Sequence, residues 1–89
     1  MFPIGNMTQR PDFFIWTNAA ELGQAVLVAR EAMGLTRIQL AASAGVGRKF
    51  LWQLEQGKAT LKMDKVMRVL EALDLMPLIV PREALAVLR

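Results

Sequence analysis

Residues 35–58, LTRIQLAASAGVGRKFLWQLEQGK, constrain the fold more than any other part of the chain, because they predict two short helices joined by a tight turn. Thr36, followed three residues later by Gln39, is a capping box in which each side chain satisfies a backbone amide of the first helical turn. Ala41 suits a steep crossing of two helices, where only a small side chain fits. Gly45 can take the positive φ angle that ends a helix and redirects the chain. The first helix should therefore span residues 36–44.

The second helix of this stretch follows Gly47, ends before Gly57 and has two faces. At 100° per residue, one arc is the core side and holds Gly47, Phe50, Leu51 and Leu54. The opposite arc holds Arg48, Lys49, Trp52, Gln53 and Gln56. Arg, Lys and Gln side chains at the start of such a helix can read guanine and adenine edges in the major groove. The pattern predicts a helix-turn-helix that binds DNA, and the alternative is a merely solvated polar face.

Positive charge is concentrated in the same part of the chain. The net charge of the 89 residues is only +3, but residues 37–68 hold seven bases against two acids, whereas the remainder holds four bases against six acids. A run of charge is usually a solvated face. Here the excess falls on the two helices of the motif and on the residues immediately after them, where a polyanion would dock.

Composition argues against an enzyme and against a membrane protein. The chain has no Cys and no His, which removes thiolate chemistry and the commonest general base and metal ligand, and its eight acids are scattered singly. No apolar run approaches the length of a membrane span, and residues 1–10 lack the features of a signal peptide. We expect no catalytic residue, no metal, no cofactor, and a cytoplasmic chain at the nucleoid.

The segments around the motif complete an expected all-α bundle of four to five helices with a short C-terminal β-strand. Residues 1–17 should form an N-terminal arm, of which residues 13–16 cover apolar surface. Within a DNA-binding domain over residues 18–75, Asn18 and Glu21 start a helix that ends near Gly34. A later helix, over residues 63–73, should close the core, with Met63, Met67 and Met76 packed on or beside its apolar stripe. Residues 76–89 should form a dimerisation strand, followed by a frayed helix or a tail.

Two prolines decide which edge of the expected strand can pair. Alternate residues of an extended chain point their amides to the same edge. Pro77 and Pro81 have no N–H and so interrupt hydrogen bonding along one edge, whereas Met76, Leu78 and Val80 keep their amides on the other. Apolar residues make up 54% of the chain, more than a core of this size usually needs. We therefore predict a homodimer joined by an antiparallel ribbon through the second edge.

Residues 22–75 resemble the phage-repressor or Xre type of helix-turn-helix domain, and GVGRKFLWQLEQGKAT is similar, more narrowly, to the HipB-type antitoxins. The resemblance implies a five-helix dimer that binds palindromic operator DNA and represses its own operon, with a HipA-like kinase toxin as the usual partner. It also implies an ion pair between Arg30 and Glu55, and the alternative is an exposed Arg30. The helix over residues 63–73 usually ends on Gly in this family, but Asp74 holds that place here.

The resemblance also distributes roles among the expected DNA-binding residues, which are Arg37, Gln39, Arg48, Lys49, Trp52, Gln53 and Lys58. By family position, Arg48, Lys49 and Gln53 match base-contacting or backbone-contacting positions. Arg37 stands where a Gln is usual, and we expect it and Lys58 to hold phosphates. Trp52 stands where a small or acidic side chain is usual, and we favour its packing within the protein or on a partner over packing on DNA.

Two other functions stay open on the sequence alone. One is a stand-alone, phage-like regulator without a toxin. The other is a protein-interaction module that kept the helices and lost DNA readout.

Overall fold

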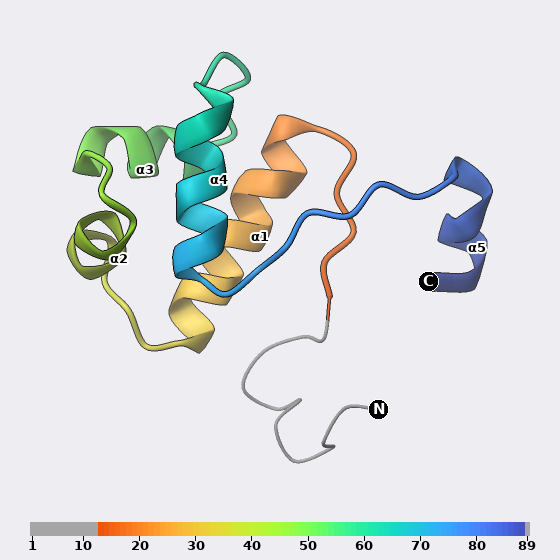
Figure 1. The fold of residues 1–89 in the computed structure, drawn as a ribbon, viewed down its shortest axis with the longest axis horizontal. Coiled ribbons are helices and arrows are strands. Elements are labelled where there is room, and N and C mark those ends of the chain that lie inside the picture. The colour runs from red at the N-terminus through yellow and green to blue at the C-terminus, as the bar shows by residue number, and fades with distance from the viewer. Residues whose placement is uncertain (1–12, 89) are drawn as a thin grey trace.

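A computed structural model of the chain describes residues 13–88, and all the regular structure in this range is helical (Figure 1). The four helices of the body are α1 (Ala19–Ala32), α2 (Arg37–Ala44), α3 (Arg48–Glu55) and α4 (Met63–Ala72). An extended segment then leads away from the body to the short 3₁₀ helix η2 (Arg82–Ala84) and to α5 (Leu85–Leu88) (Figure 1). The expected all-α helix-turn-helix bundle is confirmed.

Local side-chain signals set the boundaries of the first two helices. The Asn18 side chain accepts a hydrogen bond of 2.9 Å from the Glu21 amide, which caps α1. Thr36 and Gln39 form the capping box of α2, because the Gln39 amide donates to the Thr36 hydroxyl at 3.1 Å and the Thr36 amide donates to Gln39 Oε1 at 2.9 Å. Gly45 ends α2 with a φ of 72°, as the sequence predicts.

The chain leaves α4 through another left-handed residue. Asp74 has a φ of 59°, the region that favours glycine but that Asp tolerates better than most side chains. The Leu75 amide then donates to the Leu70 carbonyl at 2.8 Å and closes the end of the helix. Asp74 thus performs the turn for which the resemblance leads one to expect a glycine.

The apolar core lies between the four helices of the body. α1 packs on α3, and α2 packs on both α3 and α4. The buried apolar side chains that form one cluster are Val26, Ala29, Leu40, Ala41, Ala44, Leu51, Leu54, Val66, Val69, Leu70 and Leu73. Gly23 allows α1 to approach α3 closely, because a Cβ at this position would overlap the Leu54 carbonyl oxygen of α3.

Residues 13–16 precede α1 without regular secondary structure, and Phe14 packs against the core cluster. Phe14 thus covers apolar surface as expected, whereas Phe13 and Trp16 are exposed. The rest of the predicted N-terminal arm, residues 1–12, lies outside the described residues, as does residue 89.

Two expectations for the C-terminal half need correction. No β-strand is formed within residues 13–88, because a strand exists only by pairing and the backbone of residues 76–80 makes no hydrogen bond to another described segment. Met63, Met67 and Met76 are exposed rather than packed. The buried stripe of α4 consists of Val66, Val69, Leu70 and, at the helix end, Leu73. At 100° per residue Met63 and Met67 lie to one side of that stripe, so the core is closed without them.

Among residues 13–88, no helix combines the length and the apolar character needed to cross a membrane.

Candidate nucleic-acid interface

The outward face of α3 carries the polar side chains that the sequence places there. Leu51 and Leu54 are buried, and this fixes the rotation of α3 about its axis. On the opposite side Arg48 and Lys49 are exposed and Gln53 is partly buried. Arg48 is the first residue of α3, so it extends from the helix start, the end that enters the major groove in helix-turn-helix proteins.

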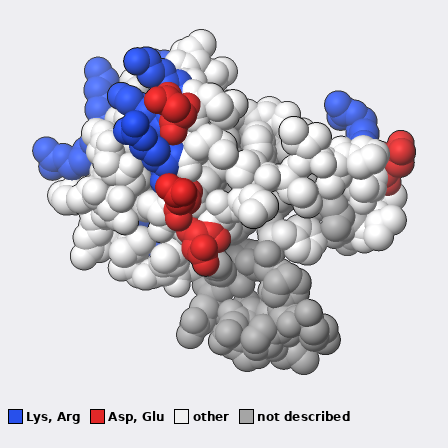
Figure 2. Space-filling model, viewed as in Figure 1, with Lys and Arg blue, Asp and Glu red and all other residues white. Residues whose placement is uncertain are grey.

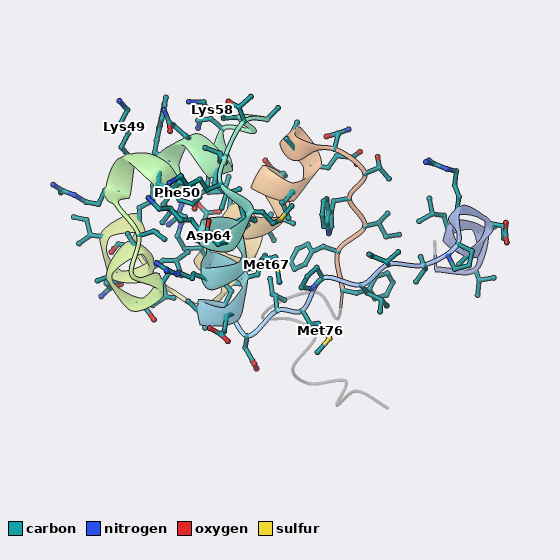
Figure 3. The ribbon with its side chains drawn as sticks, turned by 45° about the horizontal axis from the view of Figure 1, so that its top comes forward. Lys49, Phe50, Lys58, Asp64, Met67 and Met76 are labelled. Atoms are coloured by element: carbon teal, nitrogen blue, oxygen red, sulfur yellow. The ribbon has the colours of Figure 1, made fainter. Side chains whose placement is uncertain are left out.

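Basic side chains gather around this face. Figure 2 shows Lys and Arg side chains concentrated over α3 and the first turns of α4, where Asp64 lies among them, with further acidic side chains toward the end of α4. Figure 3 shows Lys49, from the start of α3, and Lys58, from the loop after it, pointing out of the same side of the molecule. Phe50 turns inward instead and packs against the core, with the Lys65 ammonium 5.7 Å from its ring centre. The surface next to α3 therefore offers several cations to a polyanion.

The ion pair expected between Arg30 and Glu55 is present and buried. Arg30 Nε donates to Glu55 Oε2 at 2.7 Å, and Arg30 Nη2 donates to Glu55 Oε1 at 3.2 Å. The third nitrogen, Arg30 Nη1, donates to the Leu35 carbonyl at 2.9 Å. Arg30 thus joins α1 to the end of α3 and to the residue that precedes Thr36, the cap of α2.

A second arginine also donates to the Glu55 carboxylate, and the sequence did not predict this contact. Arg37, the first residue of α2, donates from Nε to Glu55 Oε1 at 2.8 Å. Its expected role as a phosphate contact is untested by this bond, which uses only one edge of its guanidinium. The side-chain oxygen of Gln39 is likewise occupied, because it accepts the hydrogen bond that caps α2. The sequence held one indication of the Arg37–Glu55 bond. Glu55 is the only acidic residue between Leu35 and Lys58, so it is the only carboxylate of the motif that Arg37 could reach.

Two large apolar side chains are exposed close to the basic face. Trp52 on α3 has half of its surface, 50%, in solvent, and Ile38 on α2 is also exposed. Neither belongs to the core cluster or to the partly buried side chains packed against it. Within residues 13–88 half of the Trp52 surface is covered and the other half lies in solvent, so its full burial remains a prediction.

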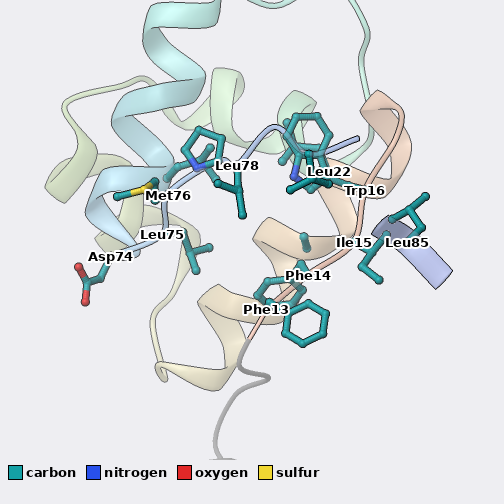
Figure 4. Close-up of a pocket in the computed structure, with 14 residues that line it drawn as sticks. Phe13, Phe14, Ile15, Trp16, Leu22, Asp74, Leu75, Met76, Leu78 and Leu85 are labelled. Atoms are coloured by element: carbon teal, nitrogen blue, oxygen red, sulfur yellow. The ribbon is translucent and has the colours of Figure 1, made fainter. Parts of the chain in front are cut away.

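The residues predicted to form the dimer line one wall of an open groove of about 350 Å³. Met76, Leu78 and Val80 line it, whereas Ile79 does not and lies almost fully in solvent. Figure 4 shows Leu75 and Leu78 on this wall, with Phe13, Phe14 and Trp16 of the N-terminal segment across the groove. The amides of Met76, Leu78 and Val80 donate to no group in the part of the chain that the structure describes.

Comparison with known proteins places these features in a family. The family described as Helix-turn-helix matches residues 28–78, which is more than half of the chain. A relative in Sinorhizobium fredii, described as an uncharacterized HTH-type transcriptional regulator y4mF, is 41% identical over 54 residues, which are 61% of this chain and 71% of the relative.

Solved structures resemble the fold more than the sequence. One, described as a HipB-O4 20mer complex, superposes with a TM-score of 0.73 at 18% identity and covers 79% of this chain and 99% of its own. Another, described as MDT Protein, gives a TM-score of 0.72 at 18% identity, with the same coverage. The chain therefore belongs to the Xre-type helix-turn-helix family of DNA-binding transcriptional regulators.

Proposed function

We propose that this protein is a sequence-specific repressor that reads operator DNA with α3. The observation that carries the proposal is the outward face of α3, where Arg48, Lys49 and Gln53 stand opposite the buried Leu51 and Leu54. Arg pairs with the O6 and N7 atoms of guanine, and Gln pairs with adenine, when a helix lies in the major groove. Lys58 and Arg37, which flank α3, hold backbone phosphates and so fix the register of the helix on the duplex.

The repressor acts as a homodimer joined through residues 76–80. The amides of Met76, Leu78 and Val80, unpaired within residues 13–88, and their apolar side chains support a ribbon with the same segment of a second copy. Pairing would satisfy those amides and cover apolar surface that the single chain leaves in solvent. A two-fold axis through the ribbon requires a palindromic operator with inverted half-sites, about one helical turn (~34 Å) or a multiple apart.

The protein is also proposed to be the antitoxin of a HipBA-like operon that it represses itself, with a HipA-like kinase as the partner. The likeness of the fold to HipB supports this role. Such a partner should avoid the basic face, because the complex must still hold DNA, and should contact the acidic and apolar regions outside residues 37–68. Co-purification with the product of a neighbouring kinase-like gene tests the assignment. If charge reversal by Arg48→Glu abolished the complex, the proposed separation of the two surfaces would be wrong.

Selection of bound duplexes from a random DNA pool tests the central proposal. The dimer should enrich an inverted repeat, and footprinting should then show protection of both half-sites. Enrichment without a neighbouring kinase-like gene would indicate a stand-alone regulator. A folded dimer that enriched no sequence would overturn the repressor proposal and indicate a protein-interaction module instead.

A further inference from the structure

Glu55 holds two arginines with a single negative charge. Arg30 donates to it from Nε at 2.7 Å and from Nη2 at 3.2 Å, and Arg37 donates to it from Nε at 2.8 Å. These three residues come from the carboxyl-terminal part of α1, the start of α2 and the end of α3. The cluster therefore joins the three helices that set the position of the helix-turn-helix, and it carries one positive charge in excess.

Burial shows where this excess charge reaches the surface. The side chains of Arg30 and Glu55 are 9% and 1% exposed, whereas that of Arg37 is 44% exposed. Arg30 uses all three of its nitrogens, since Nη1 donates to the Leu35 carbonyl. Arg37 uses only Nε, and within residues 13–88 its two terminal amino groups have no hydrogen-bond partner. The cluster thus presents its unmatched charge through the Nη1 and Nη2 atoms of Arg37.

We infer that Glu55 is a positioning residue for DNA binding, which holds Arg37 by Nε so that its two terminal amino groups grip one backbone phosphate. This inference rests on the proposed function and adds to it a role for Glu55 in orienting Arg37. A guanidinium can donate two parallel hydrogen bonds to a phosphate, and the single phosphate charge balances the cluster. Because the guanidinium is already held by one edge, binding orders fewer side-chain rotamers than it would for a free arginine.

The position of Arg37 suits such a contact. It begins α2 and reaches the last residue of α3, while Arg48 begins α3. Seven residue steps of 1.5 Å separate Arg48 from Glu55 along the axis, a distance of about 10 Å. This is slightly more than the depth of the major groove, about 8.5 Å. When the start of α3 enters the groove, its other end and Arg37 therefore lie near the phosphates at the rim.

The first experiment compares two variants that lose the same charge, Arg37→Met and Arg82→Met, in the full chain. Arg82 is exposed on η2, away from α3 (Figure 1). Affinity for a duplex selected from the random pool is measured at several salt concentrations. Arg37→Met should weaken binding at least tenfold and reduce the slope of log affinity against log salt by about one per protomer, since one phosphate contact is lost. Arg82→Met should keep the slope of the parent.

A double-mutant cycle then separates positioning by Glu55 from a general effect on the fold. Glu55→Gln should weaken DNA binding clearly more when Arg37 is present than in the Arg37→Met background, where only its bonds to Arg30 are affected. Equal weakening in both backgrounds, or an unchanged salt slope for Arg37→Met, would overturn the inference and leave the Arg37–Glu55 bond a purely structural one. Should Glu55→Gln not fold, Arg37→Lys replaces it, because Lys keeps the charge but cannot hold Glu55 by one edge and donate two parallel hydrogen bonds to a phosphate. This variant should bind the duplex more weakly than the parent, and equal binding would overturn the inference. A parent chain that binds no duplex would overturn the proposed function, and this inference with it.

Discussion

A single buried carboxylate, that of Glu55, determines how the helices around the DNA-binding face fit together. An ionised group taken out of water is costly unless its lone pairs are occupied, and Glu55 accepts three hydrogen bonds from arginines. No side-chain nitrogen or oxygen buried within residues 13–88 lacks a hydrogen-bond partner. The stability of the body should therefore depend on this residue more than on any exposed charge.

We predict that Glu55→Ala lowers the free energy of unfolding by about 3–5 kcal/mol, because it leaves the Arg30 guanidinium buried without its counter-charge. Chemical denaturation followed by circular dichroism measures the loss. Glu71→Ala is the matched control, since Glu71 is an exposed carboxylate on α4 and should change the value by no more than about 0.5 kcal/mol. A Glu55→Ala protein that unfolds at the denaturant concentration of the parent would show that the cluster adds nothing to stability.

Loss of a base contact and loss of a phosphate contact should have different effects on DNA binding. Arg48→Ala should lose about 1–3 kcal/mol per half-site on the cognate duplex and relax the preference at one base pair, because it removes a bidentate contact to guanine. Lys58→Ala should weaken cognate and scrambled duplexes similarly and reduce the salt slope by about one per protomer. Titrations of both variants on both duplexes at several salt concentrations make the comparison. Equal weakening of both duplexes by Arg48→Ala would make Arg48 a phosphate contact and leave specificity to Lys49, Gln53 or DNA shape.

The sequence predicted part of this site and not the rest, for a physical reason. The two faces of α3 follow from a helical period that is visible in the sequence, and the resemblance supplied the Arg30–Glu55 pair. The bond from Arg37 to Glu55 depends on how the start of α2 meets the end of α3, which is a tertiary contact between residues 18 positions apart. Such a contact leaves no periodic or capping signal.

At the level of the helices, local signals were reliable and non-local ones were not. Asn18, Thr36 and Gly45 set helix ends through atoms within a few residues of themselves, and each boundary agrees with its prediction. The exposure of Met63 and Met67 depends instead on how far α4 turns its apolar stripe toward α2. Ala41 is buried in the core, as its small size at a helix crossing suggested. The close approach of α1 to α3 at Gly23 is a separate contact that the sequence did not predict.

Gly23→Ala should therefore destabilise the protein although alanine is the better helix former. The added Cβ meets the backbone of Leu54 and Glu55, which cannot move without shifting α3, and such overpacking costs about 1–3 kcal/mol. Gln24→Ala, at the exposed neighbouring position of α1, is the control and should change stability by less than about 0.5 kcal/mol. Thermal melts of both variants test this prediction, and a Gly23→Ala protein as stable as the parent would mean that the α1–α3 crossing opens freely.

For the whole molecule, the main prediction is a homodimer joined through residues 76–80. Residues 76–80 leave the body as an extended segment with exposed apolar side chains, and the three amides on the edge that proline does not interrupt are unpaired within residues 13–88. An isolated strand of this kind is unstable in water unless another strand covers it. A second copy offers the same edge in the orientation that a two-fold axis requires.

Moving a proline by one residue tests the ribbon directly. Leu78→Pro removes an amide from the pairing edge, close to the two-fold axis, and should convert the dimer into a monomer in sedimentation velocity runs. Ile79→Pro is the matched control, because its amide points to the edge that Pro77 and Pro81 already interrupt, and its side chain lies outside the groove. This variant should remain a dimer. Both proteins should keep the helical content of the parent, since neither substitution lies in a helix. If Leu78→Pro stayed dimeric, or if both variants dissociated alike, the two copies would have to meet through another surface.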